Sequence, residues 1–141
     1  MQAMRGALFL PLAIRSPNRS AAESEQEMDM PKMNDRAKRI AALNDKFRKG
    51  LTSGHVHMTA GVNSKGSDFV VKALIKMMEF DDFNADNDPH GEHDFGSFEL
   101  EGETLFFKID YYDLKREFGS EDPADPKQTL RVLTIMLANE Y

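Results

Sequence analysis

The order of apolar and polar residues predicts a helix at the start of the folded part of the chain. Between residues 35 and 49 the apolar positions lie three or four residues apart, as on one face of a helix. These positions are Ala37, Ile40, Leu43 and Phe47. Asn34 or Asp35 is suited to cap the start, and Gly50 follows a basic last turn. We therefore expect a helix that ends near Lys49.

A strand and a second helix are expected next. The stretch 55–62, HVHMTAGV, alternates in polarity as a half-buried strand does, with His55 and His57 on one face. After a turn that contains glycine, Ser67 is suited to cap a helix whose apolar stripe reaches Phe80.

The last third of the chain predicts a hairpin, a loop and a final helix. Apolar and polar residues alternate on both sides of Glu-Gly-Glu at 101–103, which is typical of a β-hairpin. Residues 119–126, GSEDPADP, must form a loop because two prolines remove backbone donors. Asp125 before Pro126 resembles a helix start, so residues 129–140 are expected to be helical, although they are β-branched enough to form a strand. The element order predicts an α+β fold, a small single domain with helix, strand, helix, acidic loop, β-hairpin and helix.

Residues 1–34 are not expected to belong to this compact domain, which occupies residues 35–141. Residues 7–14, ALFLPLAI, are far fewer than the ~20 apolar residues that span a bilayer, and no small-residue cleavage site follows them. We expect a disordered tail or a misassigned start, because three methionines between residues 28 and 33 offer alternative beginnings. The acid-free, arginine-containing stretch 1–22 leaves an organellar transit peptide as an alternative.

Charge is divided unevenly along the chain, whose net charge is −6. Residues 79–125 hold 16 acidic and 3 basic residues, or −13, and the remainder holds 8 and 15, or +7. Because phosphates repel carboxylates, we expect this region to meet a basic protein or a cation, and not nucleic acid or a membrane. The lack of cysteine excludes disulfides and thiolate metal sites and suits the reducing cytoplasm. The plain alternative is a solvated, solubilising surface.

The acidic residues are densest in residues 80–96, FDDFNADNDPHGEHDFG. The EF-hand pattern fails there, because a loop that starts at Asp86 places His90 at position 5 and Ser97 at position 12. A transition-metal site in the 81–94 loop is a second alternative, since imidazole and carboxylate suit zinc, iron or manganese. Its ligands would be His90, His93 and Asp94. The simpler interpretation is that one histidine is hydrogen-bonded into the loop and the others are exposed.

Motifs of nucleophilic catalysis, phosphate-binding loops and dinucleotide fingerprints are absent from the sequence. At the end of the hairpin, Asp110 and Tyr112 alternate with Ile109 and Tyr111 and so lie on the opposite face of the sheet. If that face is exposed, it is a polar, aromatic surface suited to binding. If the final helix covers it, it belongs to the core.

Six stretches of the chain form a distinctive set. They are RIAALNDKFR (39–48), MTAGV (58–62), FDDFNADNDPHGEHDFG (80–96), FFKIDYYD (106–113), GSEDPADP (119–126) and RVLTIMLANEY (131–141). Together they resemble a family of small uncharacterised bacterial proteins, a domain of unknown function found mostly in alphaproteobacteria and on plasmids or other mobile elements. That setting implies roles such as interference with host defence or plasmid maintenance. The family's tolerance of an aromatic residue at His90 weighs against a two-histidine metal site.

From the charge pattern and the lack of catalytic motifs we predict a non-enzymatic, cofactor-free interaction protein. It would bind a basic macromolecular partner, such as a nucleic-acid-binding protein, and act as a counter-defence or regulatory factor of a mobile element. The residues expected to bind are Asp81, Asp82, Asp86, Asp88, Glu92, Asp94, Asp110, Tyr112 and Asp113. The competing hypothesis is a divalent-metal-binding or metal-dependent hydrolytic protein that uses His90, His93 and Asp94. A third interpretation, a structural subunit, expects an exposed apolar patch and self-association.

Overall fold

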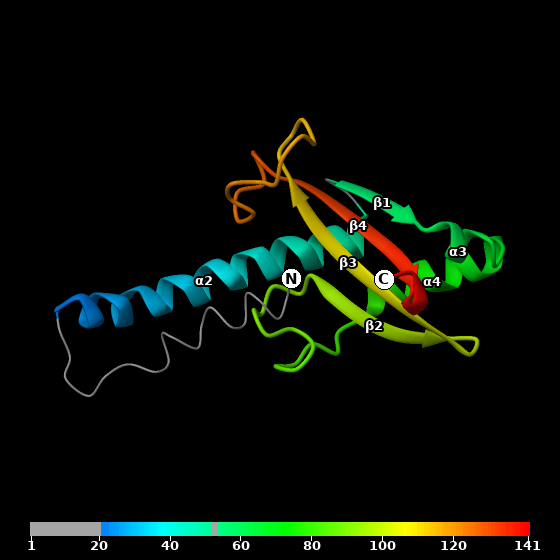
Figure 1. Cartoon of the computed structure of the whole chain (residues 1–141), viewed down its shortest axis with the longest axis horizontal. Coiled ribbons are helices and arrows are strands. Elements are labelled where there is room, and N and C mark those ends of the chain that lie inside the picture. The colour runs from blue at the N-terminus through cyan, green and yellow to red at the C-terminus, as the bar shows by residue number, and fades with distance from the viewer. Residues whose placement is uncertain (1–20, 52–53) are drawn as a thin grey trace.

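A four-stranded mixed sheet packs against two helices in the computed structural model, which describes residues 21–51 and 54–141 and the side chains from Asn34 onward (Figure 1). The helices are α2 (Ala21–Gly50), α3 (Ala60–Asn63), α4 (Ser67–Glu79) and the 3-10 turn η1 (Ala138–Glu140). The strands are β1 (Gly54–Met58), β2 (Phe95–Leu100), β3 (Glu103–Tyr112) and β4 (Leu130–Leu137). The predicted α+β class is confirmed. No helix in the described ranges is long and apolar enough to cross a membrane.

Helix α2 begins earlier than the predicted cap at Asn34 or Asp35. Its backbone is helical from Ala21, over a stretch whose alanine, glutamate, glutamine and methionine residues favour helix. The N-terminal part of α2 projects beyond the sheet, and the C-terminal part passes behind it (Figure 1). The rest of the predicted tail, residues 1–20, lies outside the described residues.

The predicted β-hairpin is confirmed as the β2–β3 pair. Its two-residue turn, Glu101 and Gly102, has φ angles of 51° and 82°, the left-handed pair that matches the twist of a tight hairpin. Strand order in the sheet is β1-β4-β3-β2, with β1 parallel to β4 and the other pairs antiparallel.

The prediction of a final helix at 129–140 was wrong, because residues 130–137 form β4. Strand β4 pairs on both sides, with β1 and with β3, and is buried on both faces, which explains its nearly continuous apolar sequence. Asp125 caps a turn instead of a helix, since its carboxylate accepts the backbone N–H of Lys127 at 2.9 Å. The local pattern of residues 130–137 suits a helix or a strand, and pairing with distant strands favours the strand.

Two smaller predictions also need correction. The strand expected over 55–62 ends at Met58, because Thr59 caps the short helix α3 by accepting the N–H of Val62. The residue that caps α4 is Gly66 and not Ser67. His55 and His57 do share one exposed face of β1, as expected.

The two faces of the sheet differ in character. Side chains from α2 and α4 cover one face and form the core, with Phe47, Ala73 and Met77 packed against residues such as Phe107 and Leu133. Register places Asp110 and Tyr112 of β3 on the other face, beside Val132 and Leu130 of β4. Because β4 replaces the expected helix, no final helix covers these two residues.

Candidate functional site: the acidic loop and its anchors

Residues 80–94, the acidic loop, begin at a point fixed by a buried arginine of α2. Arg48 is 1% exposed, and its guanidinium donates to the carbonyl oxygens of Met77 at 2.7 Å and Phe80 at 3.0 Å. These carbonyls end α4, where a cation is favoured by the unpaired oxygens and by the helix dipole. Asp45, one turn earlier on α2, pairs with Arg48 at 2.9 Å. Helix α2 therefore sets the position where α4 stops and the loop starts.

The far end of the acidic loop is held by a histidine and a buried carboxylate. The Nδ1 atom of His93 lies 3.0 Å from both carboxylate oxygens of Asp45, and its ring stacks on Phe83 with centroids 4.0 Å apart. The Asp88 carboxylate accepts the backbone N–H groups of Glu92 and His93 at 3.2 Å. Burial raises the pKa of Asp88 above its usual 3.8, against the lowering effect of the His93 N–H. Inside the loop, Asp88 and His93 thus act as structural groups.

A buried polar network connects the acidic loop to the sheet. The Asn44 amide, fully buried, donates to the Glu92 carbonyl oxygen at 2.9 Å and to the Tyr111 hydroxyl at 2.8 Å, and it accepts from Arg131 Nε at 2.7 Å. Tyr111 in turn donates to Glu92 Oε1 at 3.0 Å, and Arg131 donates to the Pro123 carbonyl oxygen at 2.6 Å. Burial raises the pKa of Tyr111 far above its ordinary value, with Asp94 and Glu92 adding to the effect. One asparagine therefore joins α2, the acidic loop, β3 and β4.

The outer side of the acidic loop carries three exposed carboxylates, Asp81, Asp82 and Asp86. Their backbone is shaped by Asn84, whose side-chain oxygen accepts the N–H groups of Asp86 and Asn87 at 2.9 and 3.1 Å. Within the described residues, none of these three carboxylates makes an ion pair. The loop thus separates its acids into an inner structural set and an outer set that faces solvent.

The predicted binding residues do not form one surface. Asp88 and Asp94 are buried, and Glu92 is half-buried beneath Tyr111. Asp110 pairs with Lys108 at 2.6 Å on the sheet face opposite the core, which also carries Tyr112. Asp113 accepts the backbone N–H of Glu117 at 3.0 Å in the connection between β3 and β4. Figure 1 shows the acidic loop and that connection at the same end of the sheet, on either side of α2.

Folding also neutralises part of the acidic region. Among the described residues, four carboxylates of the region 79–125 form ion pairs with a lysine or an arginine. These pairs are Arg36–Asp122, Lys65–Glu103, Lys72–Glu101 and Lys108–Asp110. The β2–β3 turn is therefore a surface of mixed sign, whereas the outer side of the acidic loop remains acidic.

The geometry around the predicted metal ligands does not resemble a coordination site. Among the side chains that the structure describes, no group of three or more His, Asp or Glu residues is placed to hold a metal ion. His93 directs Nδ1 at Asp45 and lies 3.9 Å from Asp88 through Nε2. His90 and Asp94 do not join it in such a group.

The anchors of this site are not among the residues predicted from the sequence. Asn44, Arg48 and Arg131 were not singled out, although the first two lie on the same helical face as Ile40 and Phe47. A polar residue on an apolar stripe was the available signal. Their partners lie far along the chain, at residues 77 to 131, so the pattern of α2 alone did not identify them.

The chain belongs to the family described as "Protein of unknown function (DUF3768)", whose model matches residues 58–140, more than half of the chain. The matched segment includes the acidic loop, the whole β2–β3–β4 sheet and the partners of Asn44, but not α2 itself. Comparison with curated proteins and with solved structures gave no match.

Proposed function

We propose that this chain is a non-enzymatic interaction protein that presents the outer side of the acidic loop to a basic surface of a macromolecular partner. Asp81, Asp82 and Asp86 are the residues that make this contact. The observation that carries the proposal is their arrangement: three exposed carboxylates, without ion pairs in the described residues, on a loop whose inner side is anchored.

Anchoring favours binding because a loop that is already ordered loses little conformational freedom in a complex. Arg48 holds the start of the loop, and Asn44 and Asp45 hold its end. Each exposed carboxylate gains about 1 kcal/mol from a cation at 4 Å in water, so three contribute about 3 kcal/mol at low salt. Such contacts weaken as the salt concentration rises. They raise the association rate more than they lengthen the lifetime of the complex.

The remaining acids of the loop have a structural role, which leaves the contact with a partner to the exposed three. Asp88 and Asp94, which the sequence grouped with the outer three, are buried in the structure, and Glu92 is half-buried. We therefore limit the proposed binding set to Asp81, Asp82 and Asp86. We propose further that the protein acts in the cytoplasm as a counter-defence or regulatory factor, in keeping with the setting that the family resemblance implies.

Photo-cross-linking tests the proposal directly. A photoreactive amino acid at Ala85, which is exposed between Asp82 and Asp86, should cross-link a basic protein in cells. The same group at Lys76, exposed on α4, is the matched control and should not capture that protein. The cross-linked protein is then purified, and its affinity is measured for wild type and for the triple variant Asp81→Asn, Asp82→Asn, Asp86→Asn.

We expect the triple variant to bind at least tenfold more weakly at 50 mM salt and to melt at the temperature of wild type. Capture of an acidic protein, or equal capture from both positions, would contradict the proposal. Unchanged affinity of the triple variant would do so as well.

A further inference from the structure

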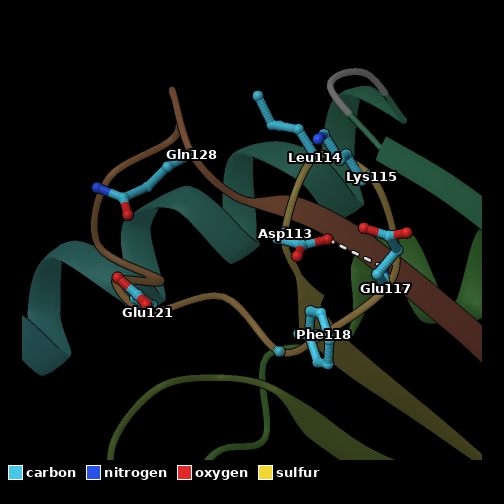
Figure 2. Close-up of a pocket in the computed structure, with 8 residues that line it drawn as sticks. Asp113, Leu114, Lys115, Glu117, Phe118, Glu121 and Gln128 are labelled. Atoms are coloured by element: carbon cyan, nitrogen blue, oxygen red, sulfur yellow. Dashed lines mark hydrogen bonds between the residues drawn. The ribbon is translucent and has the colours of Figure 1, made fainter.

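The connection between β3 and β4, residues 113–129, displays two large apolar side chains that folding does not bury. Leu114 is 63% exposed and Phe118 is 72% exposed. Both line an open cavity of about 540 Å³, together with Asp113, Glu117, Glu121 and Gln128 (Figure 2). Lys115 is the one basic residue in its lining, so the rim is acidic overall.

The turn that carries these side chains is tightly held. The backbone N–H of Asp113 donates to the Phe118 carbonyl oxygen at 2.8 Å, and the N–H of Arg116 donates back to Asp113 at 3.0 Å. The Asp113 carboxylate accepts the N–H of Glu117, the bond drawn in Figure 2. Arg116 adopts a φ of 58°, a left-handed conformation that is uncommon for a non-glycine residue.

The other side of the cavity is anchored to the core. Ser120 donates its N–H to the Tyr111 carbonyl oxygen at 3.0 Å, and its hydroxyl lies 2.7 Å from that of Thr129. Arg131 holds the carbonyl of Pro123, and Arg36 of α2 pairs with Asp122. The exposed Leu114 and Phe118 therefore stand on a rigid frame. A free, flexible loop that merely tolerates apolar residues would lack these bonds.

We propose that this cavity binds an extended segment of a partner protein in which an aliphatic or aromatic side chain is flanked by lysine or arginine. Apolar side chains of the segment pack against Leu114 and Phe118, and the flanking cations meet Asp113, Glu117 and Glu121. An aromatic anchor with a charged rim is the usual composition of a protein–protein contact centre. This binding mode rests on the proposed function, with a protein as the basic partner. It adds that the partner carries an apolar residue between lysines or arginines.

The site is tested with a defined probe, a fluorescein-labelled 12-residue peptide that carries one phenylalanine, one leucine and four lysines and no acid. Its control peptide has serine in place of the two apolar residues and keeps the charge. Binding is measured by fluorescence anisotropy in 150 mM salt for wild type, for the double variant Leu114→Ala, Phe118→Ala, and for the triple variant of the acidic loop. Val71→Ala, at an apolar position 54% exposed on α4, is the matched control.

We expect the double variant to bind the peptide at least tenfold more weakly than wild type, and the serine peptide to show a similar loss on wild type. Val71→Ala and the acidic-loop variant should keep the affinity within about threefold. Backbone amide shifts of 113–128 should move on addition of the peptide. Because Leu114 and Phe118 are exposed, their truncation should leave the melting temperature unchanged.

Equal binding by wild type and the double variant, or no binding by wild type, would overturn the inference. If affinity is instead lost in the acidic-loop variant alone, the proposed function stands and this cavity is not its site. Sedimentation of the free protein tests whether a second copy fills the cavity. If wild type is a dimer and the double variant is a monomer, a second copy occupies the site, and the inference is overturned.

Discussion

The fully buried amide of Asn44 offers the sharpest test of how the acidic loop is held. Substitution Asn44→Ala removes three hydrogen bonds, to Glu92, Tyr111 and Arg131. A buried group left without its partner costs about 1–3 kcal/mol, more when it is charged. Two buried groups lose a partner. One is the charged guanidinium of Arg131, whose pKa is already lowered by burial, and the other is the Glu92 carbonyl oxygen. Tyr111 keeps its bond to the Glu92 carboxylate.

Added together, these losses predict that Asn44→Ala lowers the free energy of unfolding by about 3–5 kcal/mol. Urea denaturation, monitored by circular dichroism, measures this loss of free energy. Asn63→Ala is the matched control, because Asn63 is exposed and makes one long bond, 3.4 Å to the Met58 carbonyl oxygen. The control should lose less than about 0.5 kcal/mol.

A double-mutant cycle that combines Asn44→Ala with Arg131→Leu isolates the interaction between Asn44 and Arg131. With the arginine gone, the loss of Asn44 should cost at least about 1 kcal/mol less than it does in wild type. Hydrogen exchange should also quicken in the acidic loop on Asn44→Ala, since the loop loses its bond to α2. The reasoning is refuted if Asn44→Ala costs no more than Asn63→Ala, or if the two substitutions in the cycle are additive.

Three further predictions concern the core and its titrating groups. Gly96→Ala should destabilise the fold by about 1–3 kcal/mol in thermal denaturation, because its Cβ would lie 2.3 Å from the Phe107 ring; a loss as small as that of a surface substitution would contradict this. Since burial raises the pKa of Asp88 above 3.8, its ionisation costs stability that returns as pH falls through the folded pKa. The stability of wild type relative to Asp88→Asn should therefore rise from pH 7 toward pH 4.5, and a fall would refute the burial argument. In an alkaline absorbance titration, one of the three tyrosines should ionise only on unfolding, and Tyr111→Phe should abolish that late phase; a late phase that survives would assign it elsewhere.

The parts of the fold that were predictable from sequence are those fixed by local chemistry. The β2–β3 hairpin depends on Glu101 and Gly102, two neighbours whose left-handed conformations are set within the turn. Strand β4 was missed because its state depends on pairing with β1, 77 residues earlier, and with β3. Its apolar run suits either a helix face or a strand buried on both faces.

The sequence identifies the acidic loop as a segment but does not show which of its acids are buried and which are exposed. Composition identified the acidic loop, but it gave the same weight to Asp82 and Asp88. The first is exposed, while the second accepts two backbone N–H groups inside the loop. That distinction depends on where the backbone N–H groups point, which only the folded loop determines. The exposure of Phe118 likewise follows from the turn that Asp113 closes.

The salt dependence of partner binding tests whether Asp81, Asp82 and Asp86 make the contact with the partner. The affinity of the protein captured at Ala85 is measured between 50 and 300 mM salt for wild type and for the variant with asparagine at positions 81, 82 and 86. Electrostatic recognition by these carboxylates predicts a steep loss of affinity with salt for wild type and a clearly shallower slope for the variant. Equal slopes for the two proteins would contradict recognition through these three carboxylates.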